Sequence, residues 1–219
     1  MELKGKKFVF IGDSITEGCG ISSTDFLYWK QFGKLTGADV YGDGIGGSRI
    51  TPQRFPNPEE PRVERYFASR VDDLPQEADV VVVFGGTNDF GTGDAALGTI
   101  ADHTNDTFYG ACHLLVEKLY QKYPEATIVL MTPLHRMSED EVLYNELGVR
   151  RVGPLSVYVN ALREIAEFYG LPVVDLFANC PIQPRVEAQR EKYMPDGLHP
   201  NDAGHALIAH CLQNVLEAL

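Results

Sequence analysis

The chain lacks a long apolar segment. None of its apolar runs approaches the roughly 20 residues that a membrane-spanning helix requires. The first residues, MELKGKKFVFIGDS, contain lysines and a short apolar run, but neither the longer apolar stretch nor the small-residue cleavage site of a secretory signal. We therefore expect a soluble, cytoplasmic protein with no membrane partner.

Cysteine is scarce and widely spaced. The chain has four cysteines and no C-x-x-C pair among them, which argues against a zinc site or a redox motif: Cys19, Cys112, Cys180 and Cys211. We expect reduced thiols, at least two of them buried.

Positive charge is also in short supply. Lysine and arginine total 19 against 31 acidic residues, so the formal net charge is -12. A field of this sign repels phosphodiester backbones and anionic membrane surfaces. Nucleic acid is therefore an unfavourable partner, and a neutral or cationic small molecule fits better.

Repeats, low-complexity tracts and linkers between two cores are absent as well. With 219 residues, 44% of them hydrophobic, the chain can bury one full core. We expect a single domain over residues 1–219.

Short apolar runs alternate with helical patterns along this domain. Runs at 8–11 and 80–84 are continuous and β-branched, as in strands covered on both faces. Further strands are predicted at 127–131 and 172–176, with a weaker one at 38–41, and helices at 26–32, 108–123, 154–169 and 201–219. This order predicts an α/β fold, a three-layer α/β/α sandwich around a mainly parallel five-stranded sheet. Functional groups are expected beyond the C-terminal ends of the strands.

Two stretches show no regular pattern. Residues 42–75 are rich in proline and arginine, and residues 135–153 mix acids with arginines. Long loops in compact domains often carry function. We expect the parts at 48–75 and 135–153 to determine substrate specificity.

Ser14 follows the first predicted strand. Because Gly12-Asp13-Ser14 falls where that strand ends, Ser14 is expected at the C-terminal edge of the sheet, next to backbone N–H groups. This position suits a nucleophile. The tripeptide alone is weak evidence, since Asp and Ser are also common turn and helix-cap residues.

Asp196 and His199 place a carboxylate three residues before an imidazole, just ahead of the last predicted helix. A serine hydroxyl needs a base to take its proton, and the base needs an acceptor on its other ring nitrogen. One short loop supplies both here. The alternative is an ordinary turn that begins at Asp196. A metal site that adds His205 matches no trusted zinc spacing.

Gly85-Gly86-Thr87-Asn88-Asp89 follows the strand at 80–84 and so reaches the same edge as Ser14. Glycines allow close backbone approach, and the Asn88 amide can donate to a developing oxyanion. A glycine-rich turn capped by Asn or Asp is the alternative.

The segment at 42–48 contains the pattern G-x-G-x-x-G of dinucleotide sites. We reject that interpretation, because these glycines follow the second strand and Thr51-Pro52 interrupts the helix that would bind the pyrophosphate. A backbone N–H donor from Gly47 is the better use of this loop.

Four segments together resemble the conserved blocks of SGNH hydrolases, also called GDSL lipases and esterases. They occur in order and span nearly the whole chain: Gly12-Asp13-Ser14-Ile15-Thr16, Gly44-Ile45-Gly46-Gly47, Gly85-Gly86-Thr87-Asn88-Asp89 and Asp196-Gly197-Leu198-His199-Pro200. Each lies at a predicted strand end or helix start, which makes the combined match specific.

The resemblance implies a flavodoxin-like fold and acyl ester hydrolysis with no cofactor and no metal. It assigns Ser14 as nucleophile, His199 as base and Asp196 as the residue that orients the base. The implied oxyanion donors are the backbone N–H groups of Ser14 and Gly47 and the side-chain amide of Asn88.

The chain departs from the family at two positions in the second block. Gly42 stands where many relatives carry Asn, and Gly46 where they often carry Ser. Both changes leave a backbone donor available and bear on local packing. The G-x-S-x-G elbow of α/β-hydrolases is absent around Ser14, which excludes that family.

Arg49 and His135 are the remaining candidates for substrate binding. Arg49 closely follows Gly47, where it could contact an anionic group of the substrate or remain a solvated loop charge. His135 follows a strand end and could line the pocket or pack against a neighbouring loop.

Three functions agree with these residues. The leading one is a serine esterase acting on a small acyl ester, such as an acetylated carbohydrate or another short-chain ester. The others are an acyltransferase that uses the same acyl-enzyme and a non-catalytic binding domain with the same fold. The acyl length, the alcohol and the oligomeric state do not follow from the sequence.

Overall fold

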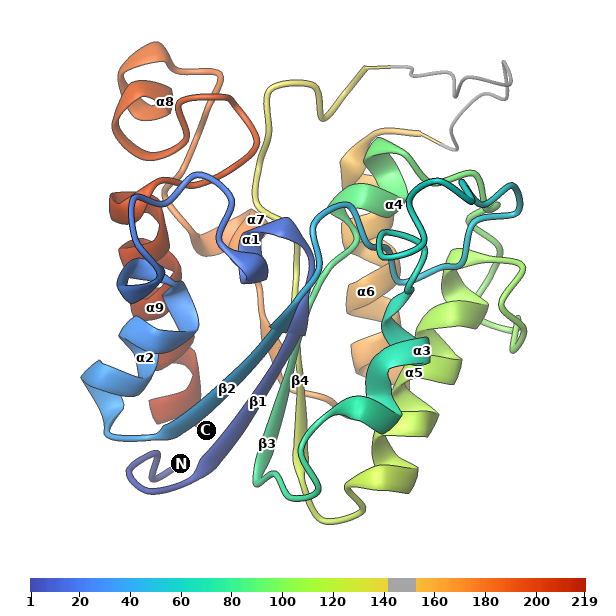
Figure 1. Ribbon diagram of the computed structural model, residues 1–219, viewed down its shortest axis with the longest axis horizontal. Coiled ribbons are helices and arrows are strands. Elements are labelled where there is room, and N and C mark those ends of the chain that lie inside the picture. The colour runs from blue at the N-terminus through green and yellow to red at the C-terminus, as the bar shows by residue number, and fades with distance from the viewer. Residues whose placement is uncertain (142–152) are drawn as a thin grey trace.

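Five strands form one parallel sheet in the computed structural model, which describes residues 1–141 and 153–219 (Figure 1). The strands are β1 (Lys7–Gly12), β2 (Asp39–Gly44), β3 (Val80–Phe84), β4 (Thr127–Met131) and β5 (Val173–Val174). Their order is β2-β1-β3-β4-β5, and every neighbouring pair is parallel. This is the flavodoxin-like order of a doubly wound sheet, which confirms the predicted fold class.

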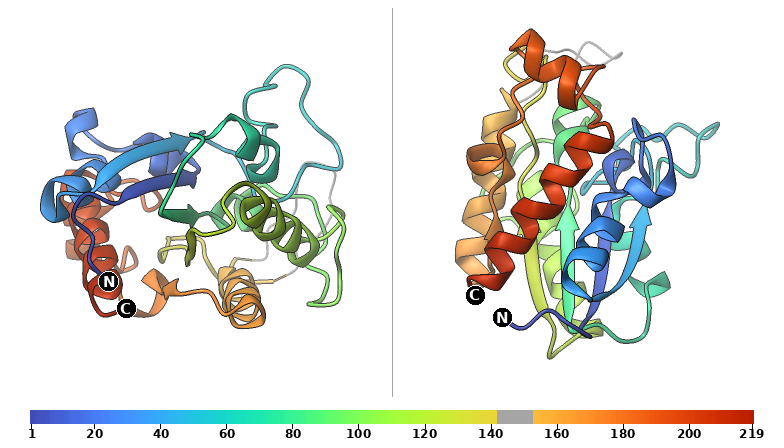
Figure 2. Two further views of the ribbon diagram at one scale, coloured as in Figure 1. Left: turned by 90° about the horizontal axis from the view of Figure 1, so that it is seen from below. Right: turned by 90° about the vertical axis from the view of Figure 1, so that its left-hand side faces the viewer.

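Helices cover both faces of the sheet (Figures 1 and 2). The helices α2 (Tyr28–Thr36) and α9 (Asp202–Glu217) pack on one face, and α3 (Phe67–Arg70), α5 (Phe108–Lys122) and α6 (Leu155–Tyr169) on the other. Four short helices lie at the loop end of the sheet: α1 (Ser14–Glu17), α4 (Thr87–Gly91), α7 (Leu176–Asn179) and α8 (Glu187–Tyr193). Two 3-10 turns, η1 (Thr24–Phe26) and η2 (Val71–Asp73), complete the described elements.

The central strand β3 shows why the sheet is buried on both faces. Val81 and Val83 pack in the core formed with α5 and α6, whereas Val80 and Val82 pack in the core formed with α2 and α9. All four are at most 2% exposed, so each valine contributes about 1.5 kcal/mol or more through burial. The uninterrupted apolar run in the sequence follows from this two-sided packing.

Three strands differ in length from their predicted bounds, and β1 is longer by one residue at each end. β2 continues to Gly44, into the stretch that was expected to be irregular, because α1 packs directly on it. A Cβ on Gly44 would lie only 2.1 Å from the backbone nitrogen of Glu17, so glycine is required at this contact. β5 is shorter than predicted, because the Asp175 side chain accepts a hydrogen bond from Ala178 and begins α7.

The first predicted helix also begins later than expected. α2 starts at Tyr28 and buries Tyr28 and Phe32, whereas Phe26 lies in a 3-10 turn and is 41% exposed. The last helix follows its prediction closely, since the Asn201 side chain accepts hydrogen bonds from Ala203 and Gly204 and caps α9.

Other expectations concern cysteines, membrane spans and one loop. Cys112 and Cys180 are buried, as expected for at least two of the four cysteines. Among the described residues, no helix has the length and apolar character needed to cross a bilayer. Most of the loop at 135–153 lies outside the described residues, which resume at residue 153.

Candidate active site

Ser14 stands at the junction of β1 and α1. The strand ends at Gly12, and the Asp13 carboxylate accepts a hydrogen bond of 3.0 Å from the backbone N–H of Ile15, which caps the helix that Ser14 begins. The turn is tight, since a Cβ on Gly12 would lie 2.0 Å from the Thr16 hydroxyl. Ser14 is 6% exposed, and its backbone N–H stands in the first helical turn, where it has no partner within the helix.

The Ser14 hydroxyl contacts the ring of His199, which is 185 residues away in the sequence. His199 Nε2 lies 3.0 Å from Ser14 Oγ, and His199 Nδ1 lies 2.7 Å from Asp196 Oδ2. Because the carboxylate holds the ring hydrogen on Nδ1, Nε2 keeps a lone pair facing the serine. The three side chains therefore have the geometry of a nucleophile, a base and the acid that orients the base.

The second carboxylate oxygen of Asp196 shapes the loop that carries His199. Asp196 Oδ1 accepts hydrogen bonds from the backbone N–H of Leu198, at 2.9 Å, and of His199, at 2.7 Å. Partial burial acts to raise the pKa of Asp196, but these backbone bonds and the His199 ring outweigh it and lower the pKa below its usual value. Asp196 is therefore ionised throughout the neutral range.

Gly47 and Asn88 reach the same edge of the sheet as Ser14. The neighbouring Gly46 lies against Ser14, since a Cβ on Gly46 would be 3.8 Å from Ser14 Cβ. The Gly47 N–H has no hydrogen-bond acceptor within residues 1–141 and 153–219, and its φ of 76° suits glycine. The Asn88 amide donates one hydrogen to the Ser48 carbonyl at 3.0 Å, which leaves its second hydrogen available.

Two carboxylates fix the loop that carries Gly47. Glu17 Oε2 accepts the Gly46 N–H at 2.6 Å, while the other oxygen of Glu17 pairs with Arg62. On the far side of the loop, buried Asp89 accepts the backbone N–H groups of residues 50 and 51 at 3.0 and 2.9 Å, and the Thr51 hydroxyl at 2.6 Å. The sequence pattern places Asp89 in its block, but it does not reveal this anchoring role or that of Glu17.

Comparison with known proteins identifies a family for this chain. The model of the GDSL-like Lipase/Acylhydrolase family matches residues 10–207. The chain belongs to this family. A comparison with curated proteins finds no match.

Solved structures resemble this GDSL hydrolase over its whole length. A protein from Lactobacillus plantarum is 30% identical with a TM-score of 0.81, and the match covers 99% of this chain and 98% of that one. A possible lipase from Chitinophaga pinensis DSM 2588 is 26% identical with a TM-score of 0.68, covering 97% and 98%. A two-domain esterase active on acetylated mannans is 24% identical with a TM-score of 0.65, and the match covers 99% of this chain and 49% of that one.

Arg70 is a buried cation beneath the site of this GDSL hydrolase. Its guanidinium donates to the Gly12 carbonyl at 2.8 Å, to the Ser48 hydroxyl at 3.3 Å and to the Asp43 carboxylate at 3.0 Å. The residue is 0% exposed, and burial lowers its pKa. Arg70 thus ties the end of β1 to the Gly47 loop. It was missed in the sequence, because an arginine in an arginine-rich stretch gives no sign of burial.

Asp13 is a second buried ionisable group, next to Ser14. It is 2% exposed, and burial raises its pKa to about 6, although the Ile15 N–H and the positive charge of a protonated His199 act in the opposite direction. Asp13 therefore gains or loses its proton at a pH that lies slightly below neutral.

Arg49 directs its charge at a protein carboxylate. Its guanidinium lies 3.0 Å from Glu64 and donates to the Gly47 carbonyl at 3.2 Å, and its side chain is 5% exposed. This placement supports the loop of Gly47 and leaves little of the cation for a substrate anion.

His135 packs against its neighbours at the end of β4. Its Nδ1 lies 2.9 Å from Glu139, and its ring contacts the Phe177 ring at a tilt of 34°, with the centroids 3.9 Å apart. The next residues reach the candidate base, since the Met137 N–H donates to the Gly197 carbonyl at 2.9 Å. This segment therefore contacts the loop of Asp196 and His199. His205, in contrast, accepts the Tyr28 N–H inside the core.

Proposed function

We propose that this GDSL hydrolase is a serine esterase that cleaves a small acyl ester through an acyl-enzyme on Ser14. The observation that carries the proposal is the chain of hydrogen bonds from Ser14 Oγ to His199 Nε2, at 3.0 Å, and from His199 Nδ1 to Asp196, at 2.7 Å. A serine of ordinary pKa becomes an effective nucleophile only when such a base takes its proton.

The reaction proceeds in two halves. In the first, Ser14 Oγ attacks the ester carbonyl as its proton passes to His199 Nε2, and Asp196 stabilises the imidazolium. The tetrahedral oxyanion is held by the backbone N–H groups of Ser14 and Gly47 and by the Asn88 amide. His199 then gives its proton to the leaving alcohol. In the second half, water takes the place of the alcohol and releases the acid.

The proposed substrate is a short-chain ester such as an acetylated carbohydrate. A fold neighbour is an esterase active on acetylated mannans, which supports this class of substrate. The net charge of -12 favours neutral or cationic esters over anionic ones. Arg49, which is paired with Glu64, adds no free cation to attract an acidic group.

The test is hydrolysis of p-nitrophenyl esters of increasing acyl length by the wild type and by Ser14→Ala. We expect activity that falls with acyl length in the wild type and disappears in Ser14→Ala. Ser69→Ala is the matched control, because Ser69 is exposed on α3 and its hydroxyl donates to the nearby Tyr66 carbonyl, remote from Ser14 in the chain. Activity that survives in Ser14→Ala would refute the mechanism.

Covalent labelling and product analysis separate the other two functions. A fluorophosphonate should add one adduct, on Ser14, whereas a non-catalytic binding domain would stay unlabelled. With an acetyl ester and added sugar, an esterase releases acetate in step with the alcohol. An acyltransferase would instead form the new sugar ester in preference to acetate.

A further inference from the structure

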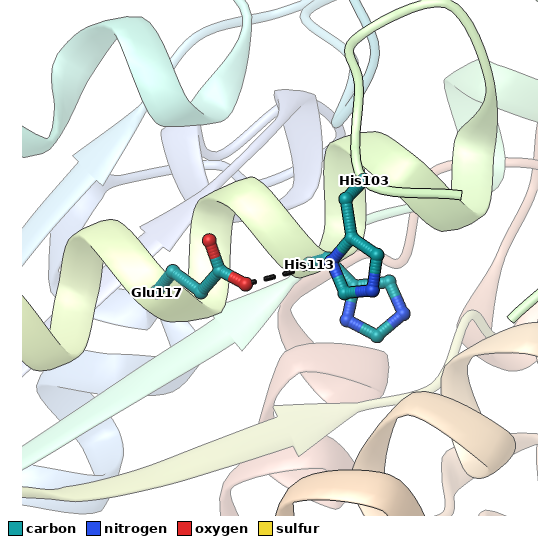
Figure 3. A group of neighbouring side chains, drawn as sticks. All are labelled: His103, His113 and Glu117. Carbon is teal, nitrogen blue, oxygen red and sulfur yellow. Dashed lines mark ion pairs between the residues drawn. The ribbon is translucent and has the colours of Figure 1, made fainter. Parts of the chain in front are cut away.

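Four polar side chains converge at a place remote from Ser14, where α5 packs against α6. His113 and Glu117 lie one turn apart on α5, His103 comes from the segment before that helix, and Tyr169 is the last residue of α6. Figure 3 shows the His103 ring over the His113 ring, with the Glu117 carboxylate directed towards them. In the part of the chain that the structure describes, these side chains bond to one another and to the Ile100 carbonyl, and not to the candidate active site.

Three separations between donor atoms of the cluster are close to those of a tetrahedral metal site. Tyr169 Oη lies 2.8 Å from His113 Nδ1 and 3.1 Å from Glu117 Oε1, and His103 Nδ1 lies 3.6 Å from the same Glu117 oxygen. Four ligands held about 2.0–2.1 Å from Zn²⁺ are separated from one another by about 3.3–3.4 Å. Two of these separations are shorter than this value and one is longer, and the ligand atoms of His103, His113 and Glu117 all lie within 4.8 Å of one another.

His113 is oriented as a metal ligand by a hydrogen bond on its other nitrogen. Its Nε2 lies 2.9 Å from the carbonyl oxygen of Ile100, which can only accept, so Nε2 carries the ring hydrogen. The Nδ1 lone pair therefore faces the cluster. A backbone carbonyl that fixes the tautomer of a ligating histidine in this way is typical of metal sites.

The Tyr169 hydroxyl cannot donate to both of its neighbours in the cluster. Tyr169 has one hydroxyl hydrogen, yet His113 Nδ1 and Glu117 Oε1 both lie within hydrogen-bond distance of its oxygen. A cation at the centre would bind both lone pairs at once.

We propose that His103, His113, Glu117 and Tyr169 form a zinc-binding site. Two imidazole nitrogens and a carboxylate oxygen are ligands that Zn²⁺ prefers, and the phenol oxygen completes the tetrahedron. The ion links α5, α6 and the segment before α5, so its role is to stabilise this side of the molecule. The sequence did not suggest it, because the spacing H-x9-H-x3-E matches none of the familiar zinc patterns.

The test is a calorimetric titration of the full chain, without a histidine tag and after treatment with EDTA, with zinc chloride. We expect one equivalent of Zn²⁺ to bind and the Tm to rise. His103→Ala and Glu117→Gln should each weaken binding by about tenfold or more, since both remove a ligand from a half-exposed position where the fold tolerates change. Tyr169→Phe should weaken binding as well.

His210→Ala is the matched control, because His210 is exposed on α9 and should leave binding unchanged. The proposal is overturned if the wild type binds no zinc, or if His103→Ala and Glu117→Gln bind it as tightly as the control. Unchanged binding in Tyr169→Phe would overturn the assignment of the phenol oxygen. The same titration of Ser14→Ala is expected to match the wild type, so the result does not depend on esterase activity.

Discussion

Replacing Asp13 with asparagine is expected to make the stability of the protein less dependent on pH. Burial raises the pKa of Asp13 to about 6 in the folded protein, above the value of about 3.9 for an exposed aspartate. The folded state therefore binds this proton more tightly than the unfolded state does. The stabilisation that follows is fully present below about pH 4 and is lost as the pH rises through about 6.

The size of the effect follows from the two pKa values. A pKa that rises from about 3.9 to about 6 corresponds to about 3 kcal/mol over the whole titration. About half of this is already lost at pH 5, so about 1.5 kcal/mol remains between about pH 5 and pH 8. The asparagine side chain does not titrate, yet its oxygen can still accept the Ile15 N–H. The free energy of unfolding of Asp13→Asn, relative to that of the wild type, should therefore rise by about 1.5 kcal/mol between about pH 5 and about pH 8.

Urea unfolding at several pH values measures this difference directly. The free energies of unfolding of the wild type and Asp13→Asn are subtracted at each pH, which removes the titrations that the two proteins share. Asp25→Asn, at an exposed carboxylate, is the control for the change of charge alone. A constant difference for Asp13→Asn would refute the argument from burial.

Three further predictions concern the supports of the proposed oxyanion site. Asn88→Ala should lower kcat by about 100-fold to 1000-fold with little change in KM, because the Asn88 amide acts mainly in the transition state. Steady-state hydrolysis measures both constants, and an unchanged kcat would exclude the amide as an oxyanion donor. Glu17→Ala should lower kcat/KM in the same assay. Glu17→Gln should keep most of it, since Gln retains an acceptor for the Gly46 N–H. Equal losses in both variants would mean that the charge of Glu17 matters and the acceptor does not. Arg70→Met should reduce the free energy of unfolding by about 3 kcal/mol in urea, because it leaves Asp43 without its partner; a loss below about 1 kcal/mol would contradict a structural role for the buried cation.

The centre of the sheet was predictable because β1, β3 and β4 are buried on both faces. Runs such as Val80–Phe84 have few structures open to them other than a central parallel strand. The ends of the strands were less predictable where contacts with distant segments determine them. β2 continues through Gly42 and Gly44 because Trp29 and Glu17 pack too closely for any side chain there, a contact between distant segments that periodicity does not record.

In the candidate site, too, some residues could be predicted from the sequence and others could not. The sequence suggested Ser14, Asp196 and His199, which the structure brings together, because each carries its own chemistry and lies at a strand end or a helix start. Arg70 and Glu17 were not found, because their roles depend on which backbone groups of other loops they meet. Their residue types are common on surfaces, so only the fold distinguishes them from solvated charges.

The two oxygens of Asp196 have a consequence for mutagenesis. One oxygen holds the loop in shape and the other holds the His199 ring, so any replacement of Asp196 disturbs the position of the base together with its electrostatic environment. A rate loss in such a variant measures both effects and cannot be assigned to either. The Ser14 side chain has a single role, since it forms a hydrogen bond only with His199 in the described structure. Ser14 is therefore the residue whose replacement tests the proposed chemistry alone.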